Sequence, residues 1–137
     1  ALIIHIDSTS RLEEIINNIK SRGVEVGIAL KPKTPNEEIY HWLLKENANG
    51  EKLVDFVQFM GSDNIGFHGV SLDEKVYEKI SALRANSPEC IIGVDIGVNF
   101  DTAPRLIEAG ANKLVSGSSI YNSDNIKEAI NRLKNEK

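Results

Sequence analysis

The chain has little cysteine and histidine: one cysteine, Cys90, and three histidines among 137 residues. A single thiol cannot form an internal disulfide, and no zinc-ligand spacing joins Cys90 to the histidines. Long hydrophobic runs are also missing, since none approaches the roughly 18–20 residues of a membrane-spanning helix. These absences exclude a disulfide framework, and they favour a protein of the reducing cytoplasm with no membrane partner.

Basic residues are outnumbered by acidic ones. Sixteen Lys and Arg residues stand against twenty Asp and Glu residues, which gives a formal net charge of −4. This balance provides no overall positive field to hold a nucleic-acid backbone, so we expect no nucleic-acid partner. The 41% of hydrophobic and 26% of charged residues are typical of folded globular proteins. At this length we expect a single domain over residues 1–137.

Short apolar runs alternate with amphipathic patterns along the chain. The runs are rich in β-branched residues and predict five strands, over residues 2–6, 24–30, 53–60, 91–95 and 113–116. Apolar residues at helical spacing follow each run, from residues 11–22 in the first unit to residues 126–133 in the last. No hairpin turn joins two strands. The pattern therefore predicts an α/β protein of five consecutive βα units with a parallel sheet.

Several helix ends carry sequence signals. A capping box pairs a hydroxyl residue with an acidic residue three positions later, and the sequence has three: Ser10 with Glu13, Thr34 with Glu37, and Ser71 with Glu74. Pro104 is tolerated only in a first helical turn, so we expect its helix to be capped near Asp101 and to end at Gly110.

Four motifs stand at or near the predicted strands. They read Val-Gly-Ile-Ala-Leu-Lys-Pro-x-Thr (residues 26–34), Val-Asp-x-Val-x-x-Met (54–60), Val-Asp-x-Gly-Val (94–98) and Glu-Ala-Gly-Ala-Asn-x-x-Val-Ser-Gly-Ser (108–118). In order and spacing they resemble the ribulose-phosphate 3-epimerase family. The segment Ile-His-Ile-Asp, ending at Asp7, is similar to that family's fourth barrel strand, where the family usually has Glu in place of this Asp.

The resemblance implies an eight-unit barrel, of which this chain matches the last five units. Five units cannot close an eight-stranded barrel, so two architectures are open. One is a partial TIM (β/α) barrel, and the other is a flavodoxin-like open sheet with helices on both faces. A curved partial barrel would expose one apolar face and two unpaired edges, and we therefore expect a homodimer.

The resemblance also implies a catalytic and metal-binding role for Asp95. In the family this position serves in acid-base catalysis and holds a divalent metal, which we take to be zinc, manganese or iron. The other metal ligands and the second acid-base carboxylate come from the family's second and third strands, outside the matched units. We therefore expect little or no epimerase activity, and no metal, from this chain alone.

Glycines near the strand ends are candidates for phosphate binding. Gly97, Gly117 and Ser118 precede helix amino termini, where free N–H groups bind phosphate, and the loops after the last two strands form the usual phosphate site of such barrels. Gly66 and Gly69, in the loop after the third strand, are further candidates. The alternative is that these glycines serve only tight turns.

Two segments depart from the family pattern. Residues 60–69 read Met-Gly-Ser-Asp-Asn-Ile-Gly-Phe-His-Gly, where the resemblance leads one to expect a Pro-Gly-Phe-Gly-Gly-Gln run. Ile96 also replaces the first of two glycines after the acidic residue. His68, in the altered loop, either contacts a ligand or is simply solvated.

His5 and Asp7 lie two residues apart on a predicted strand and would share one face, as a pair of metal ligands does. Two ligands alone make no stable site, so a hydrogen-bonded pair at the strand end is the expected arrangement. Two functions are thus compatible with the sequence. One is a protein that binds a phosphate or a small sugar phosphate, and the other is a non-catalytic assembly module that homodimerises.

Overall fold

The computed structural model describes residues 1–67 and 69–135. In this part of the chain five parallel strands form one sheet in the order β1-β2-β3-β4-β5. The strands are β1 (Leu2–His5), β2 (Val26–Leu30), β3 (Phe56–Met60), β4 (Ile91–Asp95) and β5 (Lys113–Val115). Each strand pairs with its neighbours along the chain, as the five-unit prediction requires.

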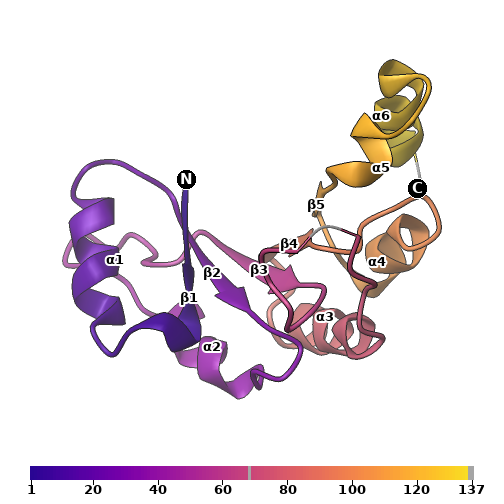
Figure 1. Ribbon diagram of the computed structural model, residues 1–137. Helices are drawn as coiled ribbons and strands as arrows, with labels where there is room; N and C mark the ends of the chain where they lie inside the picture. Colours follow the sequence, from indigo (N-terminus) through magenta and orange to yellow (C-terminus); the bar gives the residue numbers. More distant parts are fainter. Residues whose placement is uncertain (68, 136–137) are drawn as a thin grey trace.

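Helices follow the strands, and those of the first four units cover one side of the sheet. They are the 3-10 turn η1 (Ile6–Ser8) and the helices α1 (Leu12–Lys20), α2 (Glu37–Leu43), α3 (Lys75–Asn86), α4 (Ala103–Ala109), α5 (Ser118–Tyr121) and α6 (Ile126–Asn135). Figure 1 shows the strands in an arc, with α1 to α4 along its outer side.

The strand order decides between the two expected architectures. A flavodoxin-like sheet has the order 2-1-3-4-5, in which the chain reverses direction and puts helices on both faces. Here every crossover steps to the next strand in the same direction, and right-handed crossovers then place all helices on one side. The flavodoxin-like alternative is wrong, and the fold is a partial barrel.

The core lies between the sheet and these helices. Outward-facing strand residues in register, such as Ile28, Val57 and Ile92, are fully buried against Ile80 and Leu106 from α3 and α4. Strands β2 and β3 are buried along their whole length, which explains their continuous apolar sequence. At about 25 cal/mol per Å² of apolar surface removed from water, this core is the main stabilising contribution to the fold.

The inner face of the sheet, opposite the helices, has packed side chains at its centre and exposed side chains on its edge strands. The Phe56 ring lies over Gly27, where a Cβ atom would be 2.3 Å from the ring, and Lys113 Nζ lies 4.6 Å from the centre of that ring. Ile3 on β1 and Val115 on β5 are 44% and 48% exposed. Both edge strands of the partial barrel therefore carry exposed apolar side chains.

The three predicted capping boxes are wrong. Helices α1, α2 and α3 are capped at Arg11, Asn36 and Glu74, and none of these caps makes a side-chain hydrogen bond to the helix. Tertiary contacts displace the local pattern at α2, because the Asn36 side chain donates to the Lys79 carbonyl of α3 at 2.8 Å. At α3, Asp73 Oδ1 accepts the N–H of Lys75 instead of Ser71 Oγ acting as the cap.

The signals around α4 are confirmed. Pro104 lies in the first turn of α4, and Gly110 ends the helix with a φ of 117°. The helix is capped at Thr102, one residue after the expected Asp101.

Among the described residues no helix is long and apolar enough to cross a membrane.

Candidate functional site

A cavity of about 270 Å³ lies at the carboxyl ends of β3, β4 and β5. Three loops line it, each following one of these strands. The lining residues are Phe67, Gly69, Val70 and Ser71 after β3, Asp95, Ile96, Gly97, Val98 and Asn99 after β4, and Val115, Gly117, Ser118 and Ser119 after β5. The cavity therefore lies where strand ends gather functional groups in such folds.

Hydrogen bonds fix two of these loops to each other. Ser116 Oγ and Ser119 Oγ both donate to the Val98 carbonyl, at 3.0 and 3.2 Å. Thr102 Oγ1 donates to the Gly97 carbonyl at 2.8 Å. These bonds provide donors for the Gly97 and Val98 carbonyl oxygens, and the two serines join the loop after β5 to the β4–α4 loop.

Backbone donors line the cavity without partners. The N–H groups of Gly97, Gly117 and Ser118 donate no hydrogen bond to any residue that the structure describes. A concave cluster of free N–H groups can bind an anion. Among the lining residues that the structure describes, Asp95 is the only charged one, and none of them adds a cation to strengthen the attraction.

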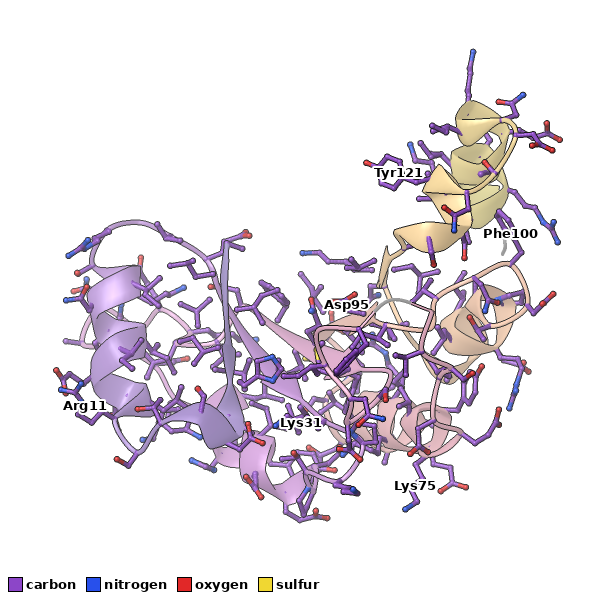
Figure 2. All side chains as sticks on the ribbon, viewed as in Figure 1. Arg11, Lys31, Lys75, Asp95, Phe100 and Tyr121 are labelled. Carbon is purple, nitrogen blue, oxygen red and sulfur yellow. The ribbon has the colours of Figure 1, made fainter. Side chains whose placement is uncertain are left out.

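Asp95 is held at the end of β4. One of its carboxylate oxygens, Oδ1, accepts the N–H of Ile96 at 2.8 Å, and its backbone carbonyl accepts the N–H of Gly61 at 2.6 Å. In Figure 2 Asp95 lies on the side of the sheet away from α3. The carboxylate is thus fixed through one oxygen, and the second oxygen accepts no hydrogen bond from the described residues.

Two glycines allow the loops after β3 and β4 to pack backbone to backbone. A Cβ atom at Gly61 would lie 1.9 Å from the Ile96 carbonyl oxygen. A Cβ atom at Gly97 would lie 2.7 Å from the Leu72 nitrogen, and Gly97 has a φ of 74°. Larger residues at either position would push the loops apart and deform the cavity.

The arrangement does not fit a divalent metal. Residues 1–67 and 69–135 contain no group of three or more His, Cys, Asp and Glu side chains that could hold one. Metals such as zinc need about four ligands, and Asp95 supplies one of them. We therefore derive no chemistry through a metal in this chain.

The expected pair of His5 and Asp7 is not formed. β1 ends at His5, and the turn η1 carries Asp7 away from the strand, where it accepts Lys31 Nζ at 2.9 Å. This hydrogen bond holds the pKa of Asp7 below its usual value. His5 Nδ1 is buried without a partner among the described residues. His68 lies outside the described residues.

The cavity gathers most of the residues singled out from the sequence. Asp95, Gly97, Gly117, Ser118 and Gly69 all line it. Gly66 is on the same loop as Gly69 but is not among the lining residues.

Sequence reasoning missed four contributors to the cavity. Ser116, Ser119 and Val98 form the link between the two loops, and Gly61 supports the backbone of Ile96. The run Ser-Gly-Ser-Ser at residues 116–119 and the glycine directly after β3 were the available signals.

Comparisons with known proteins point to one family. The model of the ribulose-phosphate 3 epimerase family matches residues 1–121. The chain is 36% identical to ribulose-phosphate 3-epimerase of Bacillus subtilis, over 99% of this chain and 61% of that protein. It is 39% identical to the chloroplastic ribulose-5-phosphate-3-epimerase of Arabidopsis thaliana, over 93% of this chain and 43% of that protein. The chain thus spans only 61% and 43% of the lengths of these relatives.

Solved structures resemble the fold at low sequence identity. A crystal structure of 3-hexulose-6-phosphate synthase matches 98% of this chain and 60% of its own, with a TM-score of 0.63 and 17% identity. A mutant tryptophan synthase alpha-subunit from Pyrococcus furiosus matches 96% of this chain and 52% of its own, with a TM-score of 0.62 and 16% identity. At these identities the likeness concerns the fold alone.

Proposed function

The chain belongs to the ribulose-phosphate 3-epimerase family, and on that premise we propose that its cavity binds a phosphate or a small sugar phosphate. The observation that carries the proposal is that Gly97, Gly117 and Ser118, whose N–H groups have no partner among the described residues, all line one cavity. The relatives' names support it, because their substrate is a ribulose phosphate. A phosphate monoester would accept hydrogen bonds from these donors through its oxygens.

We expect this binding to be weak. The donors among the described lining residues are all neutral, and the Asp95 carboxylate of the same cavity repels an anion. A dissociation constant of about 1 mM, which corresponds to about −4 kcal/mol, is consistent with such a site. The ligand's phosphate is therefore expected to contribute orientation more than affinity.

A proline substitution tests the N–H donors directly. Ser118 is the first residue of α5, where a missing N–H breaks no helical bond, and the preceding Gly117 has no Cβ atom to meet the proline ring. We expect Ser118→Pro to weaken phosphate binding several-fold in a chemical-shift titration. Ser118→Ala is the matched control, because it keeps the N–H. Phosphate-induced shifts confined to other loops, or equal affinity in both variants, would contradict the proposal.

Catalysis is proposed to be minimal in this chain alone. Epimerisation next to a carbonyl removes a proton from one face of the carbon and returns one to the other, which needs two groups. Asp95 can supply one of them. The remaining lining residues described here include no second acid or base.

The second candidate function is an assembly module, and the exposed apolar edges favour it. Leu2 and Ile3 on β1 are 52% and 44% exposed, and Val115 on β5 is 48% exposed. A homodimer would cover these side chains and the unpaired strand edges.

We also propose a cytoplasmic setting, on the evidence of the single cysteine. Cys90 is free, and burial raises the pKa of its thiol, which disfavours the reactive thiolate.

A further inference from the structure

Ile96 holds an unusual backbone conformation beside Asp95. Its φ is 75°, and it is the only non-glycine residue with a positive φ among the described residues. A β-branched residue is strongly disfavoured in this region, and such outliers cluster at functional sites. The conformation is held from both sides. Its N–H donates to Asp95 Oδ1, and its carbonyl oxygen lies against Gly61.

The side chain of Ile96 changes the character of the cavity. Ile96 lines it, as do the apolar residues Phe67 and Val115, and Val115 is in register with Asp95 on the neighbouring strand. The free N–H groups of Gly97, Gly117 and Ser118 belong to the same cavity. The cavity thus combines a polar region that suits a phosphate group with an apolar region beside Asp95.

We infer that Ile96 is a specificity-determining residue, which makes the site prefer compact phosphate esters to polyhydroxylated sugar phosphates. This inference rests on the phosphate binding proposed above. A hydroxyl group pressed against the Ile96 side chain would lose its hydrogen bonds to water and gain none from the protein. A short ester without hydroxyl groups avoids that loss and still places its phosphate on the N–H donors.

The volume of the cavity also favours compact phosphate esters. About 270 Å³ is just below the usual range of ligand sites, and Ile96 occupies space that a glycine would leave open. The N–H of Ile96 is already bonded to Asp95, so the residue adds no donor for the phosphate. Its contribution to the site is therefore the shape and polarity of its side chain.

The test compares two phosphate esters in four proteins. Ethyl phosphate and ribulose 5-phosphate are titrated by chemical-shift mapping into the natural chain and into Ile96→Val, Ile96→Ala and Ile96→Gly, with inorganic phosphate as reference. We expect the natural chain to favour ethyl phosphate by about fivefold or more. The preference for ethyl phosphate over ribulose 5-phosphate should decrease as the side chain at position 96 becomes smaller, and it should disappear in Ile96→Gly. The affinity for inorganic phosphate is measured in each protein, and both esters are compared with it, so that a change common to all three ligands cancels.

The outcomes separate this inference from the proposed function. If inorganic phosphate binds in the cavity but the preference between the two esters is equal in all four proteins, Ile96 does not set specificity and only this inference is overturned. If neither ester nor inorganic phosphate binds to any of the proteins, the proposed function fails and the inference fails with it. Ile96→Val keeps the β-branched shape, so the series remains informative if the glycine variant fails to fold.

Discussion

At the residue scale, Ile96 and Gly97 form two consecutive left-handed positions at the end of β4, with φ values of 75° and 74°. Glycine adopts this conformation freely, whereas isoleucine does so at a cost of about 1–2 kcal/mol. The fold tolerates this cost because the hydrogen bond to Asp95 and the packing on Gly61 leave the loop no other path.

Replacing Ile96 should therefore stabilise the protein. Ile96→Gly removes the left-handed penalty, and the greater freedom of glycine in the unfolded chain offsets about 0.4–1 kcal/mol of that gain. We expect a net increase of about 1 kcal/mol in the free energy of unfolding, measured by urea denaturation. Ile96→Ala, which keeps a Cβ atom, should gain less. A loss of stability in Ile96→Gly would show that the side chain's packing outweighs the strain.

Asp95 leads to a prediction about activity. The chain alone should show little or no ribulose-phosphate epimerisation in a coupled assay, with or without added zinc, manganese or iron, because the described lining residues of the cavity include no acid-base group besides Asp95. Asp95→Asn should then change nothing measurable. Turnover in the ordinary enzyme range of about 1–1000 per second, abolished by Asp95→Asn, would mean that one carboxylate suffices here.

Asp7 leads to a prediction about pH. The hydrogen bond from Lys31 lowers the pKa of Asp7 in the folded protein below the ordinary value of 3.8. The stabilisation that the Asp7–Lys31 interaction provides is therefore present above about pH 4, and it is lost as the pH falls through the folded-state pKa of Asp7. Asp7 is 40% exposed, so solvent screening limits the effect to about 0.5 kcal/mol. We expect Asp7→Asn to be less stable than the natural chain at pH 7 and equally stable near pH 2.

Thermal denaturation across that pH range measures the difference. Asp63→Asn offers a comparison at another exposed ion pair, since Lys33 Nζ lies 3.5 Å from Asp63. If the melting temperatures of Asp7→Asn and the natural chain differ by the same amount from pH 7 down to pH 2, the charge of the Asp7 carboxylate is not the cause of the difference.

At the element scale, the close approach of two loops depends on Gly61. We expect Gly61→Ala to lower the free energy of unfolding by about 2–3 kcal/mol, because the added Cβ would lie 1.9 Å from a backbone oxygen that cannot turn aside. Gly117→Ala is the matched control, since its Cβ meets nothing within 4 Å and its φ is −108°. It should stay within about 0.5 kcal/mol of the natural chain. Equal stability of the two variants in urea would refute the close packing of these loops.

The sequence predicted the strands better than their boundaries. All five strands, their parallel arrangement and the helices between them were apparent from apolar periodicity. The third strand was expected from residue 53, yet it begins at Phe56. Leu53 donates to the Lys45 carbonyl, and the Asp55 side chain accepts Lys20 Nζ and the Val26 N–H. These are tertiary contacts, and no local pattern reveals them.

In the candidate site, too, the positions of residues along the chain were predictable, whereas the contacts between loops were not. Strand-end position was enough to predict that Asp95, Gly97, Gly117 and Ser118 would gather. The left-handed backbone of Ile96 could not be predicted, because it depends on how the loops after β3 and β4 pack against each other. The same holds for Asp7, whose partner Lys31 lies one βα unit further along the chain.

At the scale of the whole molecule, the exposed edges predict association. Sedimentation at micromolar concentration should give about twice the chain mass of 15.1 kDa. Ile3→Glu places a charge on the exposed part of β1 and should shift the protein to monomer, whereas Leu44→Glu, at the 84% exposed residue that caps the C-terminus of α2, should not. A monomer of the natural chain at every concentration would remove the support for a homodimer.

The sequential strand order also has a kinetic consequence. Each strand hydrogen-bonds only to the strands of adjacent units, so every pairing closes a loop of one βα unit and no long-range closure is required. Proteins whose contacts are local along the chain fold faster than those that join distant segments. Order can therefore begin in the buried central strands β2 and β3 and spread outward one unit at a time, with the edge strands β1 and β5 ordering last and melting first.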